Sequence, residues 1–380
     1  MRILFCLLLL VAVAACDTTP LAGGDTPFVY ATDGTDRAID LVQAPSGDLI
    51  VVGSTEGKPR PADGTLALPS VLRFGLDGEL LSAEVYRDVD YGDVEAAAWG
   101  RDGLVLALSA GPDGEGDRTN GVYRANERGQ RKATLLGFDD GYLPRRALVA
   151  SPGGQVTAAV YASSTDPQIY RLRSDGDVLW TARLGGSQDV RGLAEAPGGD
   201  VYVVGPGDAT TEGWIVARLD GTTGAERWRH ALQDGVEAMA ATPNGLALLT
   251  ARYVDDEGRE VRVVRLNALG GEESVQVVSA PQDGQRGAAL TALSGGRLAV
   301  GLRTWNGWDT PPEASVLVLA NDGSEQSRER FGVEGRWVEL AAIELLADGR
   351  IAVAGAVGPE RVSGYGGDDF DVWVSLYDLD

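Results

Sequence analysis

The chain has 380 residues, with 33 lysines and arginines against 56 aspartates and glutamates, so its formal net charge is -23 at pH 7. This charge excludes nucleic acid and anionic membrane surfaces as electrostatic partners, because the counterion-release contribution to binding would have the wrong sign. Hydrophobic residues make up 44% of the chain and charged residues 23%, a composition that excludes a disordered protein. The 52 glycines indicate frequent turns.

The first 15 residues predict a secretory signal peptide. Arg2 precedes an apolar run over residues 3–12 that is too short to span a bilayer of roughly 30 Å. Residues 13–16 (VAAC) resemble the bacterial lipobox, and this resemblance implies that Cys16 is lipidated and begins the mature chain. A plain signal peptide cut near Ala14 or Ala15 is the alternative. The other cysteine, Cys6, lies within the signal, so the mature chain has no second thiol for a disulfide.

Residues 17–26 connect the lipidated cysteine to the rest of the chain. They are rich in Thr, Pro and Gly, which predicts a flexible tether. The expected organisation is therefore a signal peptide (1–15), a lipidated cysteine with its tether (16–26) and one folded body (27–380). We expect a location in the bacterial cell envelope with membrane contact through the lipid alone. In enterobacterial lipoproteins an aspartate directly after the lipidated cysteine, the position of Asp17, retains the protein at the inner membrane. Other bacterial groups do not follow this rule, so the inner and the outer membrane both stay as alternatives.

Seven similar segments follow one another along residues 27–380. A turn ending in glycine, at positions 47, 103, 154, 199, 245, 296 and 349, precedes a short segment of consecutive apolar residues. Such segments are typical of strands covered on both faces. Asp-Gly pairs at 77–78, 175–176, 220–221 and 322–323 predict hairpins. A period of about 50 residues fits the blade of a β-propeller.

The ends of the chain complement each other. The seventh repeat holds only three predicted strands, the last over residues 371–378, while residues 27–32 (PFVYAT) stand where a fourth strand would be. The sequence therefore predicts an all-β fold, a seven-bladed β-propeller with four-stranded blades, whose ring is closed by the N-terminal strand. An open β-solenoid and a pair of β-sandwiches are the alternatives.

Two stretches carry a family resemblance. Residues 217–228 (ARLDGTTGAERW) resemble the PQQ-like propeller repeat, and residues 366–373 (GGDDFDVW) resemble propeller repeats of bacterial cell-envelope proteins. The resemblance implies the propeller fold and suggests a quinoprotein-like oxidoreductase as a third functional hypothesis. Quinoprotein dehydrogenases usually have eight blades and repeat the tryptophan motif, and this sequence departs from both features.

The long connections between second and third strands predict a binding face, because in a propeller they share one face with the connections between blades. Aromatic and polar residues in these connections suit a sugar or peptide ligand through stacking and hydrogen bonding. The candidate ligand-binding residues are Trp305, Trp308, Asp309, Tyr253 and Tyr365. The alternative is that both tryptophans cap the mouth of the ring.

Two acidic groups are candidate Ca²⁺ ligands, since this ion prefers oxygen ligands. They are Asp113, Glu115 and Asp117 in one connection, and Asp368 and Asp369 in another. The first group lacks the glycine and the last acid of an EF-hand, so a solvated acidic loop is the alternative.

Catalytic combinations are scarce. His230 is the one histidine of the chain, which excludes multi-histidine zinc and iron sites, and it is predicted to lie on a fourth strand as a surface or packing residue. We therefore assign no catalytic residue.

The sequence favours a monomeric, lipid-anchored propeller that binds an envelope protein or a carbohydrate through its loop-rich face, as a binding or scaffold module. The second hypothesis is an enzyme that acts on carbohydrate or another small substrate with loop carboxylates, assisted by Ca²⁺.

Overall fold

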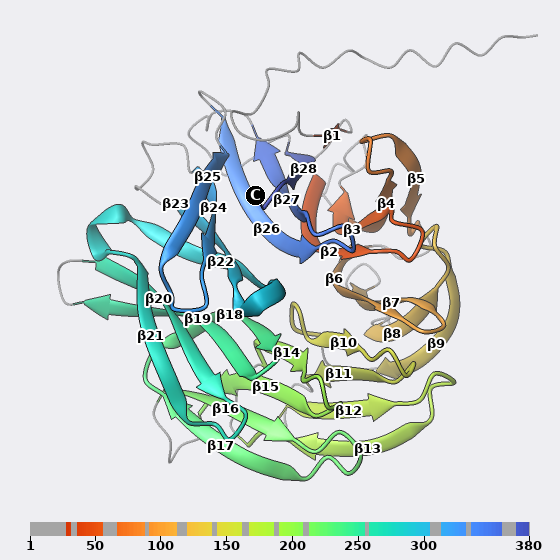
Figure 1. Ribbon diagram of the computed structural model, residues 1–380. Coiled ribbons are helices and arrows are strands. Elements are labelled where there is room, and N and C mark those ends of the chain that lie inside the picture. Colours follow the sequence, from red (N-terminus) through yellow and green to blue (C-terminus); the bar gives the residue numbers. More distant parts are fainter. Residues whose placement is uncertain are drawn as a thin grey trace, which may run out of the picture.

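The computed structural model describes residues 28–31, 36–55, 67–87, 91–111, 120–138, 143–161, 167–185, 190–207, 213–254, 258–304, 313–331, 336–358 and 370–379. These residues form seven four-stranded antiparallel sheets arranged in a ring (Figure 1), so the predicted seven-bladed β-propeller is confirmed. The helices within the described ranges are two short 3-10 turns, η2 (Pro281–Asp283) and η3 (Ser294–Gly296). Within the same ranges, no helix has the length and apolarity needed to cross a membrane.

Each blade contains four strands, which follow the chain from the innermost to the outermost except in blade 7, where β1 is the outermost strand. Blade 1 comprises β2 (Asp36–Gln43), β3 (Leu49–Thr55), β4 (Leu68–Phe74) and β5 (Leu80–Val85); blade 2, β6 (Tyr91–Gly100), β7 (Gly103–Gly111), β8 (Asn120–Ala125) and β9 (Arg131–Phe138); blade 3, β10 (Leu148–Ala150), β11 (Val156–Val160), β12 (Gln168–Leu172) and β13 (Val178–Arg183). Blade 4 comprises β14 (Gly192–Glu195), β15 (Val201–Pro206), β16 (Trp214–Leu219) and β17 (Glu226–Leu232); blade 5, β18 (Gly235–Thr242), β19 (Gly245–Val254), β20 (Gly258–Asn267) and β21 (Glu272–Ser279). Blade 6 comprises β22 (Gln285–Ala292), β23 (Leu298–Thr304), β24 (Ala314–Leu319) and β25 (Glu325–Phe331); blade 7, β26 (Trp337–Leu345), β27 (Ile351–Gly358), β28 (Asp371–Tyr377) and β1 (Phe28–Tyr30).

The N-terminal strand closes the ring as predicted. Strand β1 pairs antiparallel with β28, with Phe28 opposite Val374, and so supplies the outermost strand of blade 7. Phe28 also packs against Gly78 in the β4–β5 turn of blade 1. Gly78 has a φ of 85°, and a Cβ at this position would overlap the phenyl ring, so both the turn and the contact require glycine. The closing strand therefore joins the last blade to the first.

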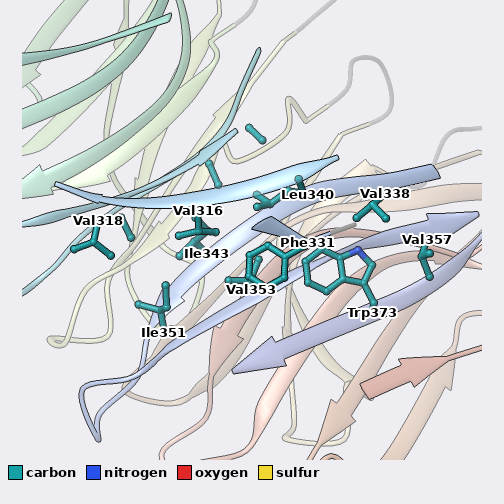
Figure 2. Packing of buried hydrophobic residues seen from close by; sticks show 14 of the residues in the cluster. Val316, Val318, Phe331, Val338, Leu340, Ile343, Ile351, Val353, Val357 and Trp373 are labelled. Atoms are coloured by element: carbon teal, nitrogen blue, oxygen red, sulfur yellow. The ribbon is translucent and has the colours of Figure 1, made fainter. Parts of the chain in front are cut away.

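Apolar side chains fill the spaces between blades. The second strand of a blade is buried along its length, as in β3 and β27, because neighbouring blades cover both of its faces. Between blades 6 and 7, Phe331 and Trp373 are fully buried with ring centroids 5.4 Å apart (Figure 2), and the Trp373 indole N–H donates to the Glu339 carbonyl at 3.1 Å. Burying an aromatic side chain with its N–H paired stabilises the contact without leaving an orphan donor.

An arginine recurs at one position of the third strand in blades 1 to 5. These residues are Arg73, Arg124, Arg171, Arg218 and Arg265. Arg171 is 2% exposed and donates to Thr157 Oγ1 in its own blade at 2.6 Å and to Glu195 Oε2 of blade 4 at 2.9 Å. It therefore holds two blades together with a buried, charge-assisted contact.

Three further arginines of this set reach the next blade. Arg218 donates to the Ala268 carbonyl at 2.6 Å, and Arg73 lies 3.3 Å from Glu127 Oε2. Arg265 donates to two carbonyl groups of blade 6, at 3.1 and 3.2 Å. An arginine of this set therefore contacts the next blade at four interfaces: between blades 1 and 2, 3 and 4, 4 and 5, and 5 and 6.

Replacing Arg171 with Met should lower the free energy of unfolding by about 3 kcal/mol, because Glu195, whose side chain is only 16% exposed, would lose its cation. Denaturant titration of the purified protein measures the loss. Arg173→Gln is the matched control, since Arg173 is two residues away, 61% exposed and 3.8 Å from Asp177; its expected effect is under about 0.5 kcal/mol. Equal losses in both variants would contradict the inter-blade role of Arg171.

Candidate binding site at the channel mouth

The innermost strands begin at the loop-rich face. In blade 1, Asp36 at the start of β2 pairs with Thr55 at the end of β3, where the long connection to β4 begins. The other innermost strands have the same direction within their blades. The first residues of these strands therefore surround the mouth of the central channel at the face that the sequence predicts to bind.

A β-bulge lies near the start of five innermost strands. The extra residues are Ile39, Glu95, Glu237, Ala288 and Ala341. A bulge inserts one residue into the strand and redirects its side chain. All five bulge residues line one cavity of about 600 Å³, so the repeated irregularity shapes the channel mouth.

The wall of this channel-mouth cavity is rich in arginine. It contains five arginines and three glutamates, which are Arg145, Arg146, Arg191, Arg259 and Arg303 with Glu95, Glu237 and Glu339. The local balance is therefore positive in a chain whose net charge is -23. Blades 3 and 4 supply three of these arginines from the residues that immediately precede β10 and β14.

Each glutamate of the wall faces one arginine. Glu237 contacts the Arg259 guanidinium, and its second oxygen accepts the Gly287 N–H at 2.5 Å. Glu95 lies 3.6 Å from the Arg145 guanidinium, and Glu339 lies 3.9 Å from that of Arg303. These pairs leave two arginines of the wall, 146 and 191, without a glutamate partner from the same wall.

A second cavity of about 380 Å³ lies deeper along the channel. Later residues of the innermost strands line it, including Leu148, Leu290 and Glu344. Arg146 and Arg191 line both cavities, so they lie at the boundary between them.

Burial changes the titration of the carboxyls in the channel. Desolvation, helped by the charge of Asp40, raises the pKa of Glu344 to about 8. Desolvation and the charge of Asp93 raise the pKa of Glu95 to about 7, against the opposing effect of Arg145. Both carboxyls thus carry less negative charge at neutral pH than exposed glutamates. Of the two, Glu95 lines the channel-mouth cavity, where its raised pKa strengthens the positive balance.

A third cavity, of about 490 Å³, lies at the opposite face between blades 5 and 6. Asn244, Arg265 and Asn321 are among its lining residues. The guanidinium of Arg265 already donates to two carbonyl groups. Fewer of its N–H donors are therefore left for a ligand than at the channel mouth.

Tyr253 is the predicted ligand-binding residue that falls within the described ranges. It lies near the end of β19 on the loop-rich face, is 74% exposed and has the Arg259 guanidinium 5.7 Å from its ring centre. The other predicted site residues lie outside the described residues; they are Cys16, Trp305, Trp308, Asp309, Tyr365, Asp113, Glu115, Asp117, Asp368 and Asp369.

Among the residues that are described, no three His, Cys, Asp or Glu side chains form a metal-binding group. His230 is half-buried on the outermost strand β17, away from the channel.

The sequence-based prediction missed the arginines of the channel. Their signal is a charged residue at the start of a first strand, as in Pro144-Arg145-Arg146 and Val190-Arg191. These residues precede short first strands, and the sequence does not show that the segments before β10 and β14 border the channel.

The comparisons with known proteins concern the fold. No protein-family model matches the chain, and no curated protein matches it. A chain in the crystal structure of the mitotic checkpoint complex is 16% identical with a TM-score of 0.57, and the alignment covers 100% of this chain and 99% of that one. The acylaminoacyl peptidase of Pyrococcus horikoshii is 9% identical with a TM-score of 0.53, covering 93% of this chain and 52% of that one. The WD40 domain of Toxoplasma gondii coronin is 10% identical with a TM-score of 0.47, and the alignment covers 76% of this chain and 82% of that one. At these identities the first two likenesses show the propeller fold alone.

The raised pKa of Glu344 predicts a pH dependence of stability. Between its ordinary value near 4.5 and about 8, the folded state keeps a proton that the unfolded state has released. Stability should therefore fall as pH rises through this window, by at most about 1.4 kcal/mol per pH unit for this group. Glu344→Gln should flatten the profile and stabilise the protein at pH 8, as measured by urea titrations from pH 5 to 9. Glu272→Gln, on the exposed strand β21, is the control; an unchanged slope in Glu344→Gln would refute the assignment.

Proposed function

We propose that the protein is a β-propeller binding module of the bacterial cell envelope, anchored through a lipid on Cys16, which engages a protein partner with its loop-rich face. The observation that supports this proposal most is the charged cavity among the starts of the innermost strands. That cavity lies on the face with the long connections, where binding residues of propellers are expected.

A protein partner fits the surface better than a small molecule alone. Tyr253 is exposed beside Arg259, and tyrosine next to arginine is a combination enriched in protein interfaces. One solved chain of similar fold, from the mitotic checkpoint complex, is part of a complex. Its identity of 16% makes this support for an interaction role and no guide to the partner.

An enzyme is the second candidate, and one observation favours it. Asp40 and Glu344 both line the deeper cavity, and burial raises the pKa of each carboxyl. Two carboxyls with perturbed pKa values in one cavity are the minimum for acid–base chemistry on a carbohydrate. Ca²⁺ assistance would have to come from the acidic connections named in the sequence, which lie outside the described residues.

Site-specific cross-linking tests the binding face. A photo-reactive residue at Tyr253 should capture the partner in intact cells, because this position is exposed on the loop-rich face. The matched control is Leu269, which is 85% exposed in the β20–β21 turn of the same blade but at the opposite face. Capture from Leu269 and not from Tyr253 would show that the wrong face is proposed.

The lipid anchor has its own test. Cys16→Ser should abolish labelling by a fatty acid and move the protein from the membrane fraction to the soluble fraction, since one apolar anchor would be lost. Fractionation with a known lipoprotein as the control measures the change. Persistent membrane association of the variant would refute the anchor.

A further inference from the structure

Arg146 and Arg191 lie at the boundary of the two channel cavities, and neither forms an ion pair with a glutamate of the channel-mouth wall. The deeper cavity also holds Asp40, whose charge acts on Arg146. The side chain of Arg191 makes no ion pair or hydrogen bond with any described residue, and it is exposed within the channel mouth. An arginine without a carboxylate in a walled cavity presents up to five N–H donors to whatever enters.

The backbone of Arg146 lies beside the segment of the neighbouring blade that follows Arg191. The carbonyl group of Arg146 accepts the Leu193 N–H at 3.4 Å, which brings the two backbone segments together. The guanidinium of Arg146 donates to the Ala341 carbonyl of blade 7, and burial lowers its pKa while Asp40 opposes that effect. The cation is therefore held in place from across the channel.

The backbone of Arg146 is unusual. Its φ of 59° makes it the one non-glycine residue with left-handed backbone among the described residues. That conformation is strained for an L-residue, because its Cβ approaches the following carbonyl oxygen. Non-glycine residues in such conformations concentrate at functional sites, where the side chain must be held in one direction.

The remaining wall suits an apolar body. Ile39, Val236, Ala288 and Leu340 line the channel-mouth cavity, and the indole of Trp214 adds an aromatic surface. A cavity of about 600 Å³ is within the range that encloses a small organic molecule.

We propose that the channel-mouth cavity binds a small organic anion with an apolar body, whose carboxylate or phosphate group lies between Arg146 and Arg191. The proposal deepens the binding role given above and rests on it. Guanidinium groups pair with both kinds of anion in a two-pronged geometry, so the arginines recognise their shared chemistry. The same anionic group is found on free small molecules and on the acidic ends of peptides.

Calorimetric titration of the purified full-length protein tests the proposal with defined probes. The probes are 3-phenylpropionate for the carboxylate arm and phenyl phosphate for the phosphate arm, each compared with its uncharged counterpart, 3-phenylpropanamide and phenol. We expect one anionic probe to bind in the range of about 1 mM or tighter and its counterpart to bind at least about tenfold more weakly. Binding of a peptide ending in phenylalanine, lost when its C-terminus is amidated, would identify a peptide end as the source.

Arg191→Gln is the deciding variant, because its side chain makes no contact that folding requires. It should weaken binding by about tenfold or more, since a charge-assisted hydrogen bond is lost. Arg173→Gln, which removes another exposed arginine, from the β12–β13 turn, should leave binding unchanged. Because Arg146 supports the fold through Ala341, Arg146→Lys serves as a second variant that keeps the charge but loses the two-pronged geometry.

Failure of both anionic probes at about 10 mM, or equal binding to Arg191→Gln and the parent protein, would overturn the anion site. The cross-linking result at Tyr253 is independent of that outcome. Capture of a partner without anion binding would remove only this inference, whereas anion binding without capture would remove the protein partner.

Discussion

The propeller depends on each blade covering both faces of its neighbours. The apolar second strands, such as β3 and β27, are buried throughout, and a blade standing alone would expose them to water. Closing the ring with β1 removes the last uncovered edge. The third-strand arginines add polar contacts at four of the blade interfaces, where Arg171 shows the tightest burial. Each interface therefore stabilises two blades, and a substitution that weakens one interface destabilises both of them.

The sequence predicted the architecture because its signals are local. Gly-terminated turns, Asp-Gly hairpins and apolar segments repeat with one period, and the unpaired strand over residues 27–32 matches β1. The channel mouth was not predictable in the same way. Whether Glu237 points to the axis depends on a bulge, and a bulge is a mismatch between two strands that neither strand reveals alone. The role of Arg171 was also missed, since its partner Glu195 belongs to another blade.

The channel shows how an acidic protein can present a positive site. The glutamates of the wall are neutralised by arginines or hold their protons more tightly than exposed carboxyls, as burial raises the pKa of Glu95 to about 7. Arg191 adds an exposed guanidinium to this wall, and the Ala341 carbonyl holds the guanidinium of Arg146 at the boundary. The whole chain has a net charge of -23, so the protein as a whole repels anions at a distance. Anions are attracted only where the local charge is positive, as it is in the cavity.

The place where the chain enters the ring also bears on its orientation. Strand β1 runs toward the loop-rich face, and Phe28 at its start packs beside the Gly78 turn, which belongs to the opposite face with the short turns. The part of the chain that the structure describes therefore enters the ring at the short-turn face, opposite the channel mouth. A segment that leads into β1 from that face leaves the channel mouth open to a ligand.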